Sequence, residues 1–482
     1  MTAIKFDNSY IKLPSQMYSH QAPTVVSAPK LIRVNYDLCR RLNVDPAWLE
    51  SKEGIAVLAG NAIPAGAEPI ATAYAGHQFG HWNPQLGDGR AVLLGEVIGC
   101  DQQRYDLQLK GSGPTPYSRQ GDGRAPLGPV LREYIVSEAM AALGVSTSRS
   151  LAAVTTGDPV YREEVLPGAV LARVAKSHIR IGTFQYFAAR DDGEALSALC
   201  AHVINRHFPE AGKADNQALA LLQAAMAAQA RLIASWQLLG FIHGVMNTDN
   251  ALLSGETIDY GPCAFMDGYE PGKVFSSIDQ GGRYAYSNQP QIAHWNLACL
   301  GSALLTQLSS DQEQAVELAQ QAINEFPAMY DSEFQRGMCR KLGIVGNQPA
   351  DAVLSADLFD IMEQSEADFT QTFHQLNKIA NGDDHLLGET FSAWLERWQA
   401  RRQANPKNSD SLGLMQSANP VYIPRNHLVE AAIEAAVTAE DYGPFHSLVD
   451  VLADPWHERE GQEEFAAPPK KDQLVQQTFC GT

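Results

Sequence analysis

The sequence has no long apolar run and few basic residues. No segment contains the ~18 consecutive apolar residues that a membrane-spanning helix needs, so we expect no membrane partner. Only 36 Lys and Arg stand against 55 Asp and Glu, which gives a formal net charge of −19. This balance argues against sequence-independent binding of nucleic acid, which requires a basic surface. An acidic chain that binds a polyphosphate must therefore gather its few cations in one place.

Paired cysteines are also lacking. The seven cysteines form no C-x-x-C motif, and their scatter is typical neither of a zinc site nor of a secreted disulfide framework. The first 22 residues contain Lys5, Asp7, Lys12 and His20 with no unbroken apolar run, so we expect no secretion signal there and a cytoplasmic location.

The length indicates more than one structural unit. A chain of 482 residues exceeds the ~250 to 300 residues at which single cores stop growing. We expect an α+β protein with an N-terminal extension at 1–65 and a β-rich lobe with one buried helix at 66–190. A second lobe with a catalytic loop and metal site follows at 191–330, and a helical region and tail at 331–482.

Local patterns predict the main elements. Strands are predicted at 90–98, 104–110 and 169–175, and a helix that is apolar nearly all round at 129–143. A long Ala- and Leu-rich helix at 216–239 ends at Gly240. Further helices are expected at 28–42, 291–308, 311–325, 351–379, 387–402 and 427–438, and two very short strands around the turn at 254–256.

The order of several short motifs is that of protein kinases. A glycine-rich hairpin is followed by a strand lysine, a helix glutamate, a His-led loop that ends in Asn, and an Asp-aromatic-Gly. Each motif alone is weak, but together, in this order and on suitable elements, they favour a protein-kinase-like two-lobed fold.

Lys110 and Glu133 are the first candidate pair. Lys110 ends a strand and lies on the face opposite its apolar residues, where a cleft would suit it. The bland alternative is a solvated lysine at a strand end. Glu133 shares a helical face with apolar residues, so its carboxylate needs an internal cation, and Lys110 is the natural partner. Alternatively, Glu133 is an acid in the first turn of a helix, favoured by the helix dipole.

The candidate catalytic loop starts at His243 and reaches Asn250 after seven residues, as in the kinase H-R-D-x-x-x-x-N loop. The catalytic aspartate of that pattern would fall at position 245, which is Val. Valine cannot accept a proton from a hydroxyl nucleophile. Asn250 and Asp259 nevertheless remain as the hard oxygen ligands with which kinases hold magnesium. The loop therefore predicts a site that binds metal and nucleotide as kinases do but does not use them for phosphoryl transfer by the usual kinase arrangement.

Glycine-rich turns and isolated arginines could supply phosphate contacts. The turns contain Gly87, Gly89 and Arg90, then 111–113, then 121–124, although Gly-Asp-Gly is also a common hairpin turn. Arg173 lies within an apolar strand and Arg180 follows seven residues later. With Arg90 they could bind a polyphosphate, and the alternative for Arg173 is a structural salt bridge.

Four histidines are not expected to bind metal. His77 and His81 have i, i+4 spacing, but Gly76 and Gly80 make a helix improbable there and no third ligand follows. His202 and His207 are interpreted as surface residues of a helix.

Longer stretches resemble one known family. They are Tyr-Ala-Gly-His-Gln-Phe-Gly at 74–80, Leu-Gly-Asp-Gly-Arg-Ala at 86–91, Leu-Lys-Gly-Ser-Gly-Pro-Thr-Pro-Tyr-Ser-Arg at 109–119, Gly-Asp-Gly-Arg-Ala at 121–125 and His-Gly-Val-Met-Asn-Thr-Asp-Asn at 243–250. With these stretches, most clearly over 71–305, the sequence resembles the selenoprotein O family of protein adenylyltransferases, often called pseudokinases.

The resemblance implies an inverted ATP whose AMP is transferred to protein hydroxyls. It implies that Asp249 is the general base, that Asn250 and Asp259 bind Mg²⁺, with Mn²⁺ as an alternative, and that Glu133 pairs with Lys110. It also implies a set of nucleotide contacts: Gly87, Gly89, Arg90, Lys110, Asp122, Gly123, Arg173, Arg180 and Asp259. Some members carry selenocysteine near the C-terminus, where this chain offers only Cys480, so a selenium-specific function is not supported.

Cys480 lies in a polar tail, and Cys263 follows Asp259 by four residues. We hypothesise a reversible regulatory disulfide between them. The alternative is a buried Cys263 and an unbonded Cys480.

Three functions stay open. The leading hypothesis is transfer of AMP, or of UMP if UTP replaces ATP, to Ser, Thr or Tyr of proteins, including this protein itself. The second is a true kinase with Asp249 as base. The third is a nucleotide-binding scaffold without turnover, against which the retained pair Asn250 and Asp259 counts.

Overall fold

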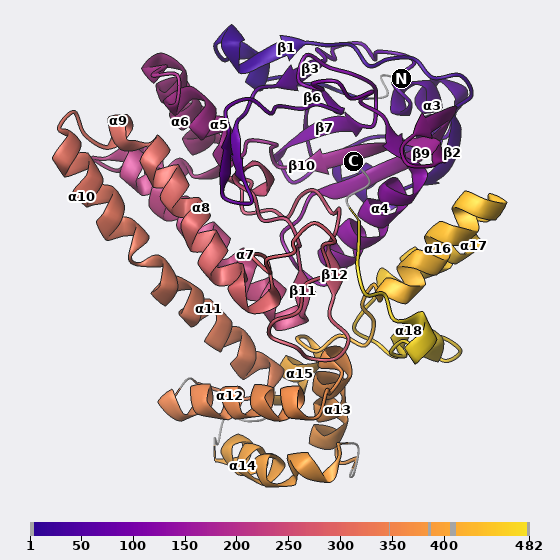
Figure 1. Cartoon of the computed structure of the whole chain (residues 1–482), viewed down its shortest axis with the longest axis vertical. Helices are drawn as coiled ribbons and strands as arrows, with labels where there is room; N and C mark the ends of the chain where they lie inside the picture. The colour runs from indigo at the N-terminus through magenta and orange to yellow at the C-terminus, as the bar shows by residue number, and fades with distance from the viewer. Residues whose placement is uncertain (1–3, 347, 384–386, 405–410, 480–482) are drawn as a thin grey trace.

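The computed structural model describes residues 4–346, 348–383, 387–404 and 411–479 (Figure 1). Strands occupy mainly the N-terminal part of the chain, and helices dominate after residue 180. The protein is therefore a mixed α and β structure in which the two kinds of element are largely segregated along the chain.

The main sheet is antiparallel and has the strand order β1-β3-β6-β7-β10-β9-β2, with β8 paired to β10. Its strands are β1 (Tyr18–His20), β2 (Lys30–Val34), β3 (Ile70–Thr72), β6 (Ala91–Ile98), β7 (Arg104–Lys110), β8 (Ala125–Pro126), β9 (Arg149–Tyr161) and β10 (Val165–Ala175). Two small two-stranded sheets pair β4 (Gly76–Gln78) with β5 (His81–Asn83) and β11 (Phe241–Ile242) with β12 (Ala264–Phe265). The predicted strands at 90–98, 104–110 and 169–175 correspond to β6, β7 and β10.

One helix, α4 (Leu127–Ala142), packs against β9 and β10. Its opposite side is covered by α16 (Asn426–Ala439) and α17 (Gly443–Leu452), which return from the far end of the chain to lie beside it (Figure 1). Because apolar partners surround α4, its nearly all-apolar sequence is explained, as predicted.

The long helix α7 (Gln217–Leu239) organises the helical part. It packs against α8 (Gln289–Ala303) and α11 (Phe326–Lys341), while α10 (Gln312–Ile323) packs on α8. Asn216 caps the start of α7 by accepting from the Leu219 amide, and Gly240 ends it at φ 68°. By length and composition α7 could cross a membrane, but 61% of its apolar window is buried inside the protein, as expected of a core helix.

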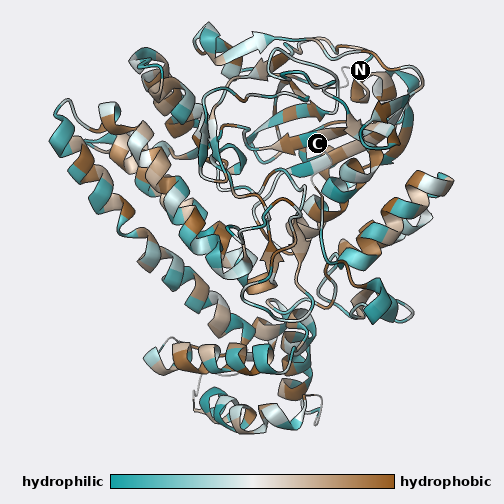
Figure 2. Ribbon diagram, in the orientation of Figure 1, coloured by the Kyte–Doolittle hydropathy of each residue, from teal (hydrophilic) through white to brown (hydrophobic). Residues whose placement is uncertain are grey.

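A second helical cluster has an aromatic core that includes Trp394 and Trp398. It is built from α12 (Pro349–Gln364), α13 (Phe369–Asn381), α14 (Ser392–Gln403) and α15 (Ser411–Gln416). Figure 2 shows hydrophilic and hydrophobic residues alternating along outer helices such as α10 and α16, as one-sided burial requires. The remaining helices are α1 (Tyr36–Arg41), α2 (Pro46–Leu49), α3 (Lys52–Leu58), α5 (Ile181–Ala188), α6 (Gly193–His207), α9 (Leu305–Leu308) and α18 (Glu463–Ala466).

Several local predictions are wrong for identifiable reasons. The segment 28–42 is not one helix, because β2 pairs with β9 and Asn35 then caps the short helix α1. The segment 351–379 forms two helices, since Glu366 adopts φ 50° and Asp368 caps α13. Around 254–256 there is no hairpin among the described residues; the flanking Leu252 and Thr257 form single bridges to distant residues.

The prediction for His202 and His207 is also wrong. Both are half-buried on α6, and burial lowers the pKa of His202 to about 4 and that of His207 to about 3. His207 Nε2 lies 2.8 Å from the Ser177 hydroxyl.

Candidate active site

All twelve candidate residues line one cavity of about 490 Å³, between the main sheet and the loop that follows α7. They are Gly87, Gly89, Arg90, Lys110, Asp122, Gly123, Glu133, Arg173, Arg180, Asp249, Asn250 and Asp259. The structure thus brings together residues that lie up to 172 positions apart in the sequence, from Gly87 to Asp259.

Three cations converge on the carboxylate of Asp259. Lys110 Nζ lies 3.1 Å from Oδ1, Arg173 Nη1 lies 2.6 Å from the same oxygen, and Arg180 Nη1 lies 2.6 Å from Oδ2. Glu133 completes the cluster, with Oε2 at 2.5 Å from Lys110 and Oε1 at 3.0 Å from Arg173. The predicted Lys110–Glu133 pair is therefore present. Arg173 forms ion pairs with both carboxylates and also lines the cavity.

The charges of this cluster are stabilised by one another. Burial alone would raise the pKa of Asp259, but Lys110, Arg180 and Arg173 outweigh burial and hold it well below its ordinary value. The pKa of Glu133 is lowered in the same way, against burial, by Lys110 and Arg173. Both carboxylates are therefore ionised at neutral pH, and three cations stand against two anions at the base of the cavity.

The loop after α7 is held by its own side chains. Buried His243 lies with Nε2 2.8 Å from the Ile258 carbonyl and stacks on Trp236 at 5.3 Å between ring centroids. Asn250 donates from Nδ2 to the Val245 carbonyl at 3.0 Å. The chain therefore fixes the loop geometry although a buried valine occupies position 245.

Asp249 is the carboxylate that this loop directs into the cavity. It lies in the short 3₁₀ turn Thr248–Asn250 and is only 7% exposed. Burial raises the pKa of Asp249 to about 6, opposed by a hydrogen bond that its Oδ2 accepts from Gln78 Nε2 at 3.0 Å. Its Oδ1 is buried and accepts no hydrogen bond from any of the residues described. A buried carboxylate with a raised pKa and one oxygen without a hydrogen-bond partner suits a general base.

Asn250 and Asp259 fit a magnesium ion that also binds phosphate oxygens. Because Nδ2 of Asn250 donates to Val245, its Oδ1 is the atom left for a ligand role. No group of three or more His, Cys, Asp or Glu that could hold a metal occurs among the residues that the structure describes. Magnesium commonly needs only one or two protein oxygens when substrate phosphates supply the rest, so the two residues suffice in number, although the Asp259 oxygens also accept from Lys110, Arg173 and Arg180.

The glycine-rich turns form a close-packed cavity wall. Gly87 has φ +87°, and an added Cβ would lie 2.4 Å from the Tyr117 ring; a Cβ on Gly123 would lie 2.1 Å from the Gly113 carbonyl oxygen. Asp88 is buried and accepts from the amide and hydroxyl of Thr72. The glycines are therefore required by packing between turns, beyond the needs of a simple hairpin.

Asp122 is less available for a nucleotide contact than the sequence suggests. Its carboxylate forms two hydrogen bonds with Arg162, at 2.9 and 3.0 Å, and lies on the cavity rim with 42% of its side chain exposed. Arg162 was not predicted from the sequence, nor was Gln78, which touches Asp249, nor Gln108, whose Oε1 accepts from Arg173. Gln78 belongs to the stretch 74–80 that resembles the known family, but its partner Asp249 lies 171 residues away, so the sequence did not indicate the contact.

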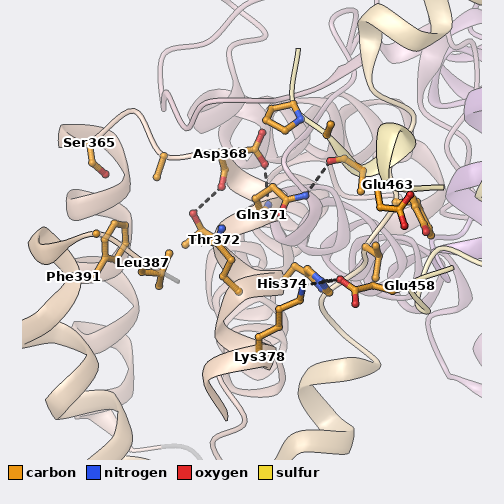
Figure 3. Close-up of a pocket in the computed structure, with 18 of the residues that line it drawn as sticks. Ser365, Asp368, Gln371, Thr372, His374, Lys378, Leu387, Phe391, Glu458 and Glu463 are labelled. Carbon is orange, nitrogen blue, oxygen red and sulfur yellow. Dashed lines mark hydrogen bonds and ion pairs between the residues drawn. The ribbon is translucent and has the colours of Figure 1, made fainter. Parts of the chain in front are cut away.

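A larger hollow of about 980 Å³ lies near α13 and the C-terminal segment (Figure 3). None of the twelve candidates lines it. Two of its basic residues are already paired, since His374 and Lys378 both contact Glu458, at 2.9 and 2.7 Å. The smaller cavity, with its convergent charges and the unpartnered oxygen of Asp249, is therefore the candidate active site.

A cavity with clustered cations, two oxygen ligands and a buried carboxylate is typical of an enzyme that acts on a nucleoside triphosphate. A family model described as "Protein adenylyltransferase SelO" matches residues 1–453. A relative in Bradyrhizobium sp. (strain ORS 278), named protein nucleotidyltransferase YdiU, is 55% identical over 485 residues, which cover 99% of each chain. A relative of the same name in Methylorubrum populi is 53% identical over 498 residues, which cover 100% of each chain. The chain belongs to the SelO family of protein adenylyltransferases.

Proposed function

We propose that this protein transfers AMP from ATP to Ser, Thr or Tyr hydroxyls of proteins, including itself, and releases pyrophosphate. The observation that carries the proposal is the placement of Asp249, which lines the cavity with its Oδ1 buried and without a hydrogen-bond partner among the described residues, while Val245 stands at the position of the kinase base. Membership of an adenylyltransferase family and the nucleotidyltransferase names of the relatives support the same reaction.

In the proposed reaction the oxygen of the acceptor hydroxyl attacks the α-phosphorus of ATP, and Asp249 accepts the proton of that hydroxyl. The bond between the α-phosphorus and the bridging oxygen to the β-phosphate breaks, and pyrophosphate leaves. Lys110, Arg173 and Arg180, with Arg90 at the cavity wall, face the growing negative charge of this leaving group. Glu133 orients Lys110.

Gly87, Gly89 and Gly123 bring backbone close to the nucleotide, and Asp122 on the rim completes the proposed contacts. A Mg²⁺ ion, or Mn²⁺ in its place, held by Asn250 and Asp259, would neutralise charge on the triphosphate. UTP is an alternative donor, which would make UMP the transferred group.

The proposal includes a protein-kinase-like arrangement with a cytoplasmic location. The first lobe would be 66–190, with its sheet and α4, and the second 191–330, with the loop and metal ligands; 1–65 would be an extension and 331–482 a helical addition. The contact between β7 and α4 through Lys110 and Glu133 supports this assignment, because kinases pair a strand lysine with a helix glutamate in the same way.

The decisive experiment incubates the protein with Mg²⁺ and ATP labelled at either the α- or the γ-phosphate. The α-label should remain on protein and the γ-label should leave as pyrophosphate. Retention of γ-label alone would establish the alternative kinase with Asp249 as base, and retention of neither label on any acceptor would leave a nucleotide-binding scaffold.

The regulatory disulfide between Cys263 and Cys480 stays a prediction, because Cys480 lies outside the residues that the structure describes. The nearby Thr478 supports it: its hydroxyl donates to the Pro262 carbonyl at 2.6 Å, and its amide donates to Phe275. The tail thus reaches the residue next to Cys263. Peptide mapping after oxidation should find the linked pair, and finding both thiols unlinked would end the hypothesis.

A further inference from the structure

A small hairpin from the N-terminal half of the chain reaches the candidate catalytic loop. Strands β4 and β5 pair Gly76 with Asn83, His77 with Trp82, and Gln78 with His81. Strand β4 belongs to the stretch 74–80, for which neither the sequence nor the proposed reaction gives a role, and β5 follows that stretch directly. The His77 amide donates to the Thr248 hydroxyl at 2.7 Å, so this hairpin is bonded directly to the turn that carries Asp249.

The tip of the hairpin has an uncommon backbone conformation. Phe79 and Gly80 both have positive φ, 52° and 83°. A two-residue turn of this kind favours Asn-Gly, and a phenylalanine there is strained. The Phe79 amide compensates by donating to Asn247 Oδ1 and to the Tyr284 hydroxyl, each at 3.1 Å. The strained turn is therefore held by the catalytic loop, a pattern found where position matters for function.

Two residues of the hairpin touch the Asp249 carboxylate itself. Gln78 Nε2 donates to Oδ2 at 3.0 Å. Gly76 lies against the other oxygen, since a Cβ added there would come within 2.7 Å of Oδ1. One oxygen is thus bonded, and the other is buried against Gly76, where a side chain on residue 76 would clash with it.

We propose that Gln78 is a positioning residue for the base: its amide holds Oδ2 of Asp249 and so fixes the orientation of the carboxylate that receives the proton of the acceptor hydroxyl. This inference rests on the proposed function, in which Asp249 is that base. Gly76 serves the same arrangement by leaving room for Oδ1. The carboxylate could otherwise turn about its Cβ–Cγ bond, and the hydrogen bond from Gln78 removes that freedom before the reaction starts.

A glutamine is chemically suited to this task. Its neutral amide donates a hydrogen bond without placing a further formal charge beside Asp249. Burial leaves few competing donors, because Asp249 is 7% exposed. The expected effect of losing Gln78 is therefore on kcat, with nucleotide binding retained.

The test compares Gln78→Met, which keeps the length and shape of the side chain but lacks the donor, with Gln78→His, which keeps an N–H donor. With α-labelled ATP and a saturating acceptor protein, Gln78→Met should lower kcat about 10-fold or more, since a misplaced base loses most of the usual effect of general base catalysis. KM for ATP should change by less than about twofold, and Gln78→His should recover part of the rate. His81→Ala, at the partner position of the same hairpin, is the control and should keep the wild-type rate.

A double-mutant cycle with Asp249→Asn separates positioning from general support of the fold. If Gln78 acts through Asp249, Gln78→Met should cause little further loss in the Asp249→Asn background. An equal fractional loss in both backgrounds, or a Gln78→Met enzyme with wild-type kcat, would overturn the inference. Full activity of Asp249→Asn alone would instead refute the assignment of the base, on which the inference depends, and so the two failures are distinguishable.

Discussion

Lys110 and Glu133 form a direct ion pair, with Nζ and Oε2 2.5 Å apart, between the last residue of β7 and the buried side of α4. Both side chains are almost fully buried, at 10% and 3% exposure. Neither charge would be stable there alone, so the pair ties the position of α4 to the strand that lines the cavity.

Lys110→Ala should therefore abolish transfer of α-label, to below about 1% of wild type, because it removes a cation at the site of the leaving group. The fold should survive, since Arg173 still pairs with Glu133 at 3.0 Å. Glu133→Ala should reduce transfer more mildly. Lys213→Ala, a solvent-exposed lysine paired only with Glu210, is the control. Circular dichroism checks the fold, and a fully active Lys110→Ala enzyme would contradict the role of this strand.

The sequence predicts this part of the site because the physical signals are local. Alternation along 104–110 puts Tyr105, Leu107 and Leu109 in one core cluster and Lys110 on the other face. A charged residue on an otherwise apolar helix or strand, such as Glu133 or Arg173, indicates a buried partner before that partner is known.

The parts that the sequence does not predict depend on long-range contacts. Gln78 is an ordinary polar residue until the hairpin meets Asp249, and Asp122 looks open until Arg162 pairs with it. The covering of α4 by α16 and α17 joins segments about 300 residues apart, as in the contact of Arg132 with Glu430. No periodicity within one segment encodes such pairings.

Asp259→Asn should bind metal-free ATP more tightly than the wild type does. In the wild type Lys110, Arg173 and Arg180 share the Asp259 carboxylate, and its loss leaves them facing the cavity with Glu133 as the nearest anion of the cluster. The triphosphate then takes the place of the lost charge. Calorimetry in EDTA should show at least about a threefold lower Kd, while transfer with Mg²⁺ is lost. Weaker binding in EDTA would contradict this account of the cluster.

Replacement of Arg425, which lies away from the cavity, should have a large effect on the stability of the fold. Its side chain is fully buried and contacts Asp267 at 2.5 Å and Asp368 at 2.8 Å. Arg425→Met leaves two carboxylates unpaired, so the free energy of unfolding should fall by about 3 to 5 kcal/mol in urea denaturation. Arg397→Met removes an exposed pair with Asp357 and should cost less than about 1 kcal/mol. Equal effects of the two variants would show that burial does not govern these ion pairs.

Because of Lys341, the stability of the folded protein should depend on pH. It is 2% exposed, its Nζ donates to the Ala418 carbonyl at 3.2 Å, and burial lowers the pKa of Lys341 from 10.5 to about 7. Between these values the unfolded chain binds a proton that the folded chain lacks, so the free energy of unfolding should rise with pH. The rise due to Lys341 is about 1 kcal/mol from pH 8 to 9. Urea denaturation of wild type and Lys341→Met should differ by this slope, and parallel curves would contradict the low pKa.

Asp249→Ala should lose at least about 100-fold in the rate of α-label transfer, the usual effect of removing a general base. Its affinity for ATP should stay close to that of the wild type, because the cations that face the triphosphate are paired with Asp259 and Glu133, and Arg180 meets residue 249 only through its backbone carbonyl. Asp192→Ala, which removes a helix-capping carboxylate outside the cavity, is the matched control for loss of an acidic side chain and should keep the rate.

Quench-flow measurement of a single turnover separates the chemical step from pyrophosphate release. An undiminished single-turnover rate in Asp249→Ala would keep AMP transfer as the reaction but remove Asp249 from it, whereas a loss of ATP binding would mean that the residue organises the nucleotide site and does not act as the base.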